Sequence, residues 1–122
     1  IGSPLVAKCT DADILQVLIN LLDNSVYWLI ADKLFDRQIE ITLDGNRCAM
    51  IFSDNGPGIK NEDIPYIFEA FYSGKGEDGR GLGLYISRKL LERNGYSIEV
   101  SDLKDDSILK GANFIVSFVK DE

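Results

Sequence analysis

Two asparagines in an apolar segment are the first candidates for binding chemistry. Asn20 and Asn24 are four residues apart among leucines, isoleucines and valines, so in a helix their side chains lie on the same face. Asparagine is a poor helix former, and a buried amide needs hydrogen-bond partners. Either the two amides lie at the edge of the apolar face and bond to a neighbouring loop, or their oxygens face a cation or phosphate site.

A carboxylate precedes a glycine-rich turn farther along the chain. Asp54 ends an apolar segment, and the following Asn55-Gly56-Pro57-Gly58 cannot continue a strand. A carboxylate in this place can accept a hydrogen bond from a ligand that approaches the glycine backbone closely. The same residues also suit an ordinary Asx turn, and the segment alone does not separate the two interpretations.

A second glycine-rich motif opens a predicted helix. Residues 79–84 read Gly-Arg-Gly-Leu-Gly-Leu, and the free N–H groups at a helix start favour an anion such as phosphate. The spacing matches neither the dinucleotide fingerprint nor the P-loop, so neither of those domains is expected. A glycine hinge is the simpler alternative. Lys75 and Arg80 either supply positive charge for phosphates or face solvent.

Composition excludes several classes of chemistry. The 122 residues fit one domain, and 20 acidic against 13 basic residues give a net charge of −7, which disfavours nucleic acid and anionic membranes as partners. The absence of histidine removes Ser-His-Asp catalysis, the common zinc sites and an internal phosphohistidine. Cys9 and Cys48 are expected to be reduced core thiols. No signal peptide or membrane span is evident, which favours a cytoplasmic location, with a membrane-tethered parent protein left open.

Hydrophobic periodicity predicts two long helices, at residues 13 to about 35 and at 82–93. The residues expected to face the core from the first helix are Ile14, Leu15, Val17, Leu18, Leu21, Leu22, Val26, Leu29 and Ile30. Those expected to face inward from the second are Leu82, Ile86, Leu90 and Leu91. One or two helical turns at 64–71 and a mobile, polar segment at 72–80 are expected between the helices.

Alternating apolar residues and turn signals predict five strands in a single domain spanning 1–122. They are expected at 5–9, 38–43, 47–52, 96–100 and 114–119. Asp44-Gly45 joins the second and third of these strands into a hairpin, and residues 102–106 form a polar turn before the last strand.

The order of the motifs is more specific than any one of them. An N-x-x-x-N helix, D-N-G-P-G, the aromatic segment 67–71, G-R-G-L-G-L and Gly111-Ala112-Asn113-Phe114 follow one another. Over about residues 5–118 this succession resembles the ATP-binding catalytic domain of sensor histidine kinases, in the superfamily that also holds gyrase, Hsp90 and MutL. The resemblance implies the Bergerat fold. This is an α+β, two-layer α/β sandwich with a mixed, largely antiparallel sheet, helices on one face, and ATP between the helices and a flexible lid.

The resemblance also implies roles for individual residues. Asn24 matches the asparagine that holds magnesium, and Asn20 matches the position one turn earlier, near the phosphates. Asp54 matches the aspartate that hydrogen-bonds the adenine amino group. Lys75 resembles a lid lysine and, with Asn20, is assigned a catalytic role. The implied nucleotide-binding set is Asn20, Asn24, Tyr27, Asp54, Gly56, Gly58, Ile59, Phe71, Lys75, Arg80, Gly81, Leu82, Gly83 and Leu84.

Three positions depart from the usual pattern of this family. Tyr27-Trp28 stands where lysine followed by tyrosine is common, Arg80 replaces a common threonine, and Gly111-Ala112 stands in place of Gly-Thr. One customary phosphate or ribose contact is therefore missing or is supplied by Arg80.

The residue at position 20 bears on the reaction. Hydrolases of this superfamily activate water with a glutamate there, and the amide of Asn20 cannot take a proton. The expected function is therefore transfer of the γ-phosphoryl group of Mg-ATP to a histidine on a separate dimerisation domain, with a response regulator downstream. A nucleotide-gated interaction module and a gyrase- or MORC-type ATPase fragment are the alternatives. The histidine-bearing helices are expected in a longer parent protein, and the fold is expected to survive Asp54→Ala.

Overall fold

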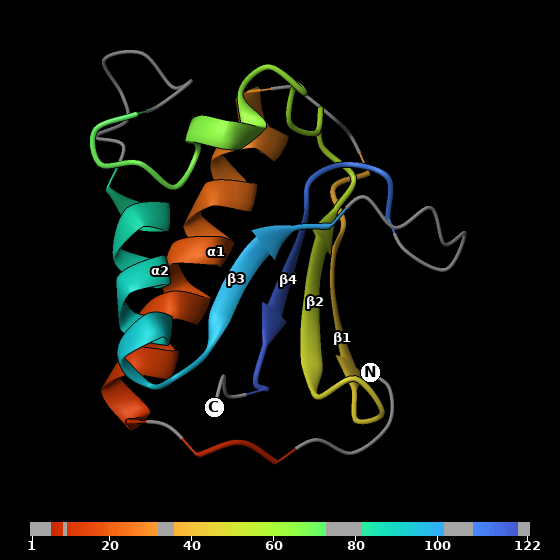
Figure 1. Ribbon diagram of the computed structural model, residues 1–122. Coiled ribbons are helices and arrows are strands. Elements are labelled where there is room, and N and C mark those ends of the chain that lie inside the picture. The colour runs from red at the N-terminus through yellow and green to blue at the C-terminus, as the bar shows by residue number, and fades with distance from the viewer. Residues whose placement is uncertain (1–5, 9, 32–35, 73–81, 102–108, 120–122) are drawn as a thin grey trace.

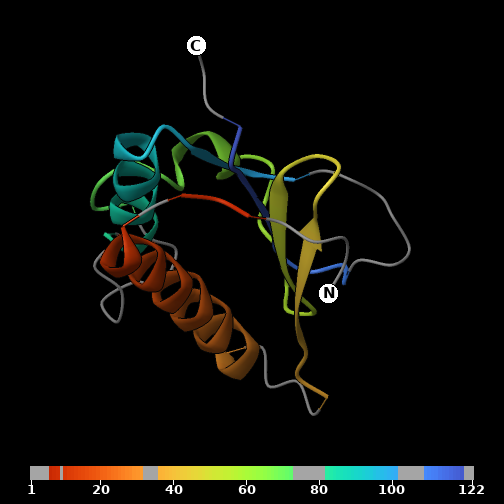
Figure 2. The same ribbon diagram turned by 90° about the horizontal axis from the view of Figure 1, so that it is seen from below.

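The computed structural model describes residues 6–8, 10–31, 36–72, 82–101 and 109–119. Its elements are α1 (Asp11–Ala31), β1 (Ile39–Asp44), β2 (Ala49–Asp54), a 3-10 turn η1 (Ile64–Tyr66), α2 (Gly83–Arg93), β3 (Ser97–Val100) and β4 (Asn113–Ser117). The strands form one sheet in the order β1-β2-β4-β3, and each neighbouring pair is antiparallel. The two long helices pack together on one face of this sheet (Figures 1 and 2). The expected two-layer α+β sandwich is confirmed.

The core lies between the helices and the two central strands. Phe52 of β2 is paired with Phe114 of β4, and Met50 with Val116, so these side chains share the helix-facing side of the sheet. They pack with residues of α1, α2 and β3, namely Val17, Leu21, Leu91 and Ile98. Every residue of β2 is buried, and the strand therefore holds Asp54 at its end in a rigid place.

The β1–β2 hairpin is confirmed, with a shift of one or two residues at its ends. The Asp44 carboxylate accepts hydrogen bonds from the backbone N–H groups of Asn46 and Arg47 at 3.1 and 3.2 Å, which closes the turn. Cys48 ends this turn with a positive φ of 49°. Its thiol is free, as predicted, but it is exposed, so the predicted place in the core is wrong for Cys48; Cys9 lies outside the described residues.

Helix α1 buries a different row of side chains from the predicted stripe. Its core-facing row takes every fourth residue, and consists of Val17, Leu21, Ser25 and Leu29. Four residues expected in the core are instead 41% to 58% exposed: Leu15, Leu22, Val26 and Ile30. Apolar residues occur on more than one side of this helix, so periodicity alone does not identify the buried row.

Helix α2 follows its prediction except at one position. It ends at Arg93 with Asn94 as its C-cap, and the following Gly95 has a φ of 83°, as expected for a glycine stop. Ile86, predicted to face inward, is 39% exposed, whereas the adjacent Ser87 is wholly buried. The small serine fits the close contact between α2 and α1, where a larger side chain would separate the helices.

The predicted strand at 5–9 does not form at residues 6–8, the part of it that the structure describes. Tyr96 explains how this segment is held instead. The backbone N–H of Lys8 donates to the Tyr96 hydroxyl at 3.1 Å, and that hydroxyl donates to the Lys8 carbonyl at 2.5 Å. Hydrogen bonds to a side chain therefore take the place of the backbone hydrogen bonds that a paired strand would provide. Among the described helices, none combines the length and the apolar character needed to cross a membrane.

Candidate functional site

The carboxylate of Asp54 is the centre of a buried cluster at the end of β2. Asp54 is 1% exposed. Its Oδ1 accepts hydrogen bonds from the backbone N–H groups of Gly56 at 2.9 Å and Ala112 at 3.0 Å. Its Oδ2 accepts one from the Ser25 hydroxyl at 2.7 Å. The bond to Gly56 is the Asx turn that the sequence allows, and the other two bonds extend this turn into a cluster that joins β2, the segment just before β4, and α1.

Glycines allow the chain to pass close to this carboxylate. The Gly111 N–H donates to the Asp54 carbonyl at 2.8 Å, and the Asp54 N–H donates to the Ala112 carbonyl at 3.0 Å. A Cβ on Gly111 would lie 2.4 Å from Asp54 Oδ1 and 2.5 Å from the Asp54 carbonyl oxygen, which is inside the contact limit. Gly56 is tight against the same Oδ1, and Gly58 has a φ of 80° beside the Gly111 backbone. The structure therefore brings Asp54, Gly56, Gly58 and Gly111 together.

Asn20 lies on α1 opposite the start of α2. Its Nδ2 donates to the Gly83 carbonyl and to the Ser87 hydroxyl, both at 3.1 Å. Its Oδ1 accepts a hydrogen bond from Gln16 at 2.8 Å. The bond to a neighbouring element considered from the sequence is therefore present, and the neighbour is a helix rather than a loop.

Asn24 lies one turn along the same face and differs from Asn20. Its side chain is half-buried, and within the described part of the chain its amide makes no hydrogen bond. Its amide oxygen and N–H groups are thus not engaged by any described residue. Farther along the helix, Tyr27 and Trp28 are half-buried and pack edge to face with ring centroids 5.1 Å apart.

Aromatic residues border the segment predicted to be a lid. Phe68 packs edge to face with Phe114, with ring centroids 6.3 Å apart, and the Arg88 guanidinium lies 5.7 Å from its centroid. Phe71 is 78% exposed with a φ of 68°. The Tyr72 hydroxyl donates to Asp63 at 2.5 Å, and this bond raises the pKa of Tyr72 above its ordinary value. Tyr72, the first residue of the predicted lid, is thus tied to the fold.

The remaining predicted site residues divide between two groups. Leu82 precedes α2 and provides no side-chain cap for it, while Leu84 and Ile59 pack against the core. The other members lie outside the described residues: Lys75, Arg80 and Gly81, together with the rest of the predicted mobile segment from 73 onward.

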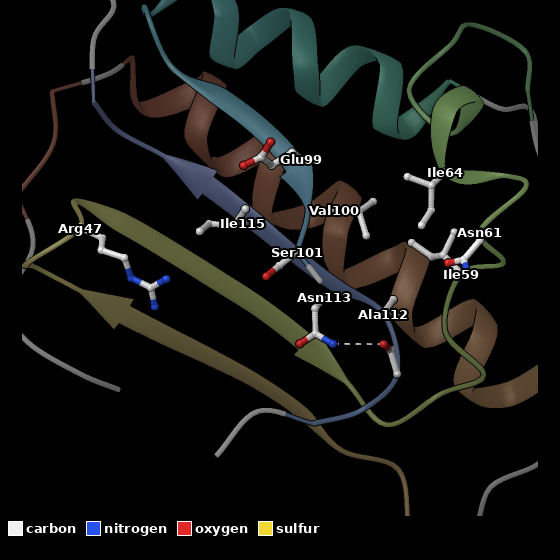
Figure 3. Close-up of a pocket in the computed structure, with 11 residues that line it drawn as sticks. Arg47, Ile59, Asn61, Ile64, Glu99, Val100, Ser101, Ala112, Asn113 and Ile115 are labelled. Atoms are coloured by element: carbon white, nitrogen blue, oxygen red, sulfur yellow. Dashed lines mark hydrogen bonds between the residues drawn. The ribbon is translucent and has the colours of Figure 1, made fainter. Parts of the chain in front are cut away.

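A cavity of about 650 Å³ adjoins the Asp54 cluster and is lined in part by Ala112, although not by Asp54 itself. Residues of β3 and β4 line it, with Arg47 at one end and the segment around Ile59 and Ile64 at the other (Figure 3). Asn113 donates to the Gly111 carbonyl at 3.1 Å, and its buried Oδ1 has no hydrogen-bond partner among the residues that the structure describes. The cavity shares Ile59 with the predicted site and Gly111 and Ala112 with the surroundings of Asp54, but Asp54 and Asn24 are not among its lining residues.

Sequence reasoning missed Ser25 and Ser87, the two wholly buried serines that bond to Asp54 and Asn20. Ser25 lies four residues after Leu21 and four before Leu29. This spacing becomes a signal only once the row is known to face the core, where a hydroxyl needs a partner.

These features define the class of the protein. A helix-covered antiparallel sheet, with a buried aspartate and a glycine turn at the end of β2, is a two-layer sandwich of the Bergerat type. Residues 10–122 match the family described as histidine kinase-, DNA gyrase B-, and HSP90-like ATPase, and the chain belongs to this family.

Relatives within the family are sensor kinases. Sensor protein ChvG of Rhizobium meliloti (strain 1021) is 35% identical over 108 residues, which cover 84% of this chain and 18% of ChvG. Sensor protein SrrB of Staphylococcus aureus (strain NCTC 8325) is 36% identical over 115 residues, covering 88% of this chain and 18% of SrrB. The nucleotide-free catalytic domain of histidine kinase ThkA superposes with a TM-score of 0.70 at 30% identity, over 94% of this chain and 74% of that domain. The resemblance to histidine kinase catalytic domains is thereby confirmed, and the chain spans about a fifth of the length of these curated relatives.

Proposed function

We propose that this chain binds Mg-ATP and donates the γ-phosphoryl group to a histidine on a separate dimerisation domain, as the catalytic domain of a two-component sensor histidine kinase. A response regulator would then receive the phosphoryl group. The observation that carries the proposal is the Asp54 cluster. A buried carboxylate with one Oδ2 lone pair left, beside backbone that only glycine permits, suits the amino group of adenine.

Magnesium fits the donor set at the other end of the site. The described residues hold no cluster of three or more histidine, cysteine or acidic side chains that could form a metal site by themselves. Mg²⁺ at a nucleotide usually keeps several waters and binds phosphate oxygens, so it needs few protein ligands. The amide oxygen of Asn24 is a hard ligand of this kind. When bound, the ion would neutralise negative charge on the phosphates.

Transfer is favoured over hydrolysis because of how Asn20 is held. Its amide cannot act as a base, and its donors and acceptor already bond to Gln16, Gly83 and Ser87. We assign it the role of holding the first turn of α2, whose N–H groups would face the phosphates. Lys75 and Arg80 are proposed to supply positive charge from the lid.

In the proposed reaction, an imidazole nitrogen of the acceptor forms a bond to the γ-phosphorus. The bond from that phosphorus to the β–γ bridging oxygen breaks, and ADP leaves. The chain itself orients the nucleotide and stabilises charge, which is most of what phosphoryl transfer requires. Because Asp54 is 1% exposed, neighbouring side chains must move before a base can reach it.

The test is phosphorylation of the full-length protein that contains this sequence. Incubation with γ-labelled ATP should give an acid-labile, alkali-stable phosphohistidine, and Asn24→Ala should abolish most of the label. Titration calorimetry on the 122-residue chain should show binding of ATP with magnesium. Absence of ATP binding would overturn the proposal entirely.

The Tyr27–Trp28 pair favours a second candidate, a nucleotide-gated interaction module. Two packed aromatic rings occupy the place where related kinases commonly have a lysine contact. In that case the chain would bind ATP, and nucleotide would change its docking to a partner, yet the full-length protein would form no phosphohistidine. The labelling experiment separates the two candidates. A cytoplasmic location in a membrane-tethered parent is proposed for both.

A further inference from the structure

Ser25 is a hydroxyl in a place where an apolar side chain is expected. It lies in the core-facing row of α1 between Leu21 and Leu29, and it is wholly buried. Serines inside helices commonly bond to the carbonyl one turn earlier. The Ser25 hydroxyl instead donates to Oδ2 of Asp54, 29 residues away in sequence, at 2.7 Å. It is the shortest of the three hydrogen bonds to this carboxylate, and it comes from the opposite layer of the sandwich.

The hydrogen bonds leave the carboxylate with one direction in which to accept another donor. Each carboxylate oxygen has about two acceptor positions. Both positions on Oδ1 are used by backbone N–H groups of Gly56 and Ala112. One position on Oδ2 is used by Ser25. The last position on Oδ2 is therefore fixed in direction by the serine.

The hydroxyl hydrogen of Ser25 is also committed. A serine hydroxyl has a single hydrogen, and here it points to Asp54. Towards anything else, the Ser25–Asp54 pair can present only oxygen lone pairs. An amino group with two N–H donors is complementary to such a pair, whereas a carbonyl oxygen would be repelled.

We propose that Ser25 is a positioning residue that aims Asp54 at the exocyclic amino group of adenine and so strengthens selection of 6-amino purines. This inference rests on the proposed function, because it assumes that a base reaches Asp54. It assigns to Ser25 a role in ligand selection rather than in packing alone.

The experiment is a cycle of two changes, one in the protein and one in the ligand. Ser25→Ala removes the hydroxyl, and purine riboside triphosphate, which has hydrogen in place of the 6-amino group, removes the ligand donor. Dissociation constants are measured for both ligands with parent and variant, in the presence of magnesium. If Ser25 aims Asp54 at the amino group, Ser25→Ala weakens ATP by about tenfold and leaves purine riboside triphosphate nearly unchanged.

Ser87→Ala is the matched control. Ser87 is the other wholly buried helix serine, and its hydroxyl accepts from Asn20 rather than bonding to Asp54. Its removal should leave the ratio of the two dissociation constants unchanged. Ser25→Thr keeps the hydroxyl donor and should give the same ratio of dissociation constants as the parent. Thermal melting of each variant establishes that it is folded.

The outcomes are distinct. An equal loss for both ligands in Ser25→Ala would overturn the inference and make Ser25 a packing residue. If Ser25→Ala melts like the parent and binds both ligands with the parent's dissociation constants, the inference is overturned too. If the parent itself binds both ligands equally, Asp54 does not read the amino group and the inference about Ser25 fails at its premise, whereas a parent that binds neither ligand would overturn the proposed function.

Discussion

The two ends of the candidate site are built differently. At the Asp54 end, a wholly buried carboxylate is bonded to a wholly buried serine and to the backbone of Ala112, just before β4. At the other end, Asn24 is half-buried and its amide has no hydrogen bond within the described part of the chain. The first end is therefore part of the fold itself, whereas at the second end the fold leaves the Asn24 amide unengaged by any described residue. Substitutions should separate these two situations, because stability and binding change together at one end and separately at the other.

Asp54→Ala should have the largest effect, on both properties. It leaves the N–H groups of Gly56 and Ala112 and the Ser25 hydroxyl without their acceptor, and buried orphan donors cost about 1–3 kcal/mol each. We expect a loss of about 3 kcal/mol in unfolding free energy and a loss of about a hundredfold in ATP affinity. The sequence alone suggested that the fold would survive unharmed, and the three bonds revise that expectation. Urea unfolding and calorimetry measure the two quantities.

Asp54→Asn is the control for this change, since it keeps an oxygen for the backbone donors while losing the charge. It should lose less stability than the alanine variant. If Asp54→Ala unfolds at the same urea concentration as the parent, the cluster is not part of the fold and the contrast between the two ends disappears.

Gly111→Ala tests the close approach to Asp54 without replacing any polar residue. The added Cβ would meet Asp54 Oδ1 at 2.4 Å and the Gly56 nitrogen at 2.6 Å, so backbone must move. Overpacking of this kind costs about 1–3 kcal/mol, and we expect the upper part of that range. Gly83→Ala is the matched control, because the nearest atoms to its Cβ belong to Asn20 at 4.0 Å. That variant should be neutral or more stable by up to about 1 kcal/mol, since alanine favours the helix. Equal melting of the two variants would contradict the close approach.

Asn24→Ala should separate binding from stability. Because its amide makes no hydrogen bond to any described residue, we expect the unfolding free energy to change by less than about 0.5 kcal/mol. If Asn24 acts through magnesium, ATP affinity should fall about ten- to a hundredfold with the metal and little without it. Asn20→Ala, one turn earlier, should instead lower the unfolding free energy by about 1 kcal/mol, because it removes the hydrogen bonds from Asn20 to α2. Equal affinity losses with and without magnesium would make Asn24 a structural residue.

The sequence predicts the elements better than it predicts their faces. Turn residues and periodicity placed four strands and both helices within a few residues, because these signals are local. The buried row of α1 was not predictable, because leucine and isoleucine occur on several faces of that helix and only packing against the sheet decides which row is covered. The Ser25–Asp54 bond was not predictable for a related reason. It joins residues on opposite layers, and no local pattern records that contact. Asp54 itself was identifiable, because a strand end followed by two glycines is a short-range signal.

Asp13 gives the smallest expected effect, and it serves as a reference far from either end of the site. Its carboxylate accepts hydrogen bonds from Arg93, one of them at 2.7 Å, and from Asn94 at 2.9 Å, which together hold the pKa of Asp13 below its ordinary value. A carboxyl whose pKa is lower in the folded state stabilises the fold above its unfolded pKa, and that contribution is lost as the pH falls through the folded value. Asp13→Asn should therefore be slightly less stable than the parent at pH 7, and the difference should shrink as the pH drops below about 4. The effect is small because the Arg93 side chain is 64% exposed and screened by water. Urea unfolding of the two proteins across this pH range measures the difference, and ATP affinity at pH 7 should be the same for both. If the difference in unfolding free energy stays constant with pH, Asp13 stabilises the fold through the shape of its side chain rather than through its charge.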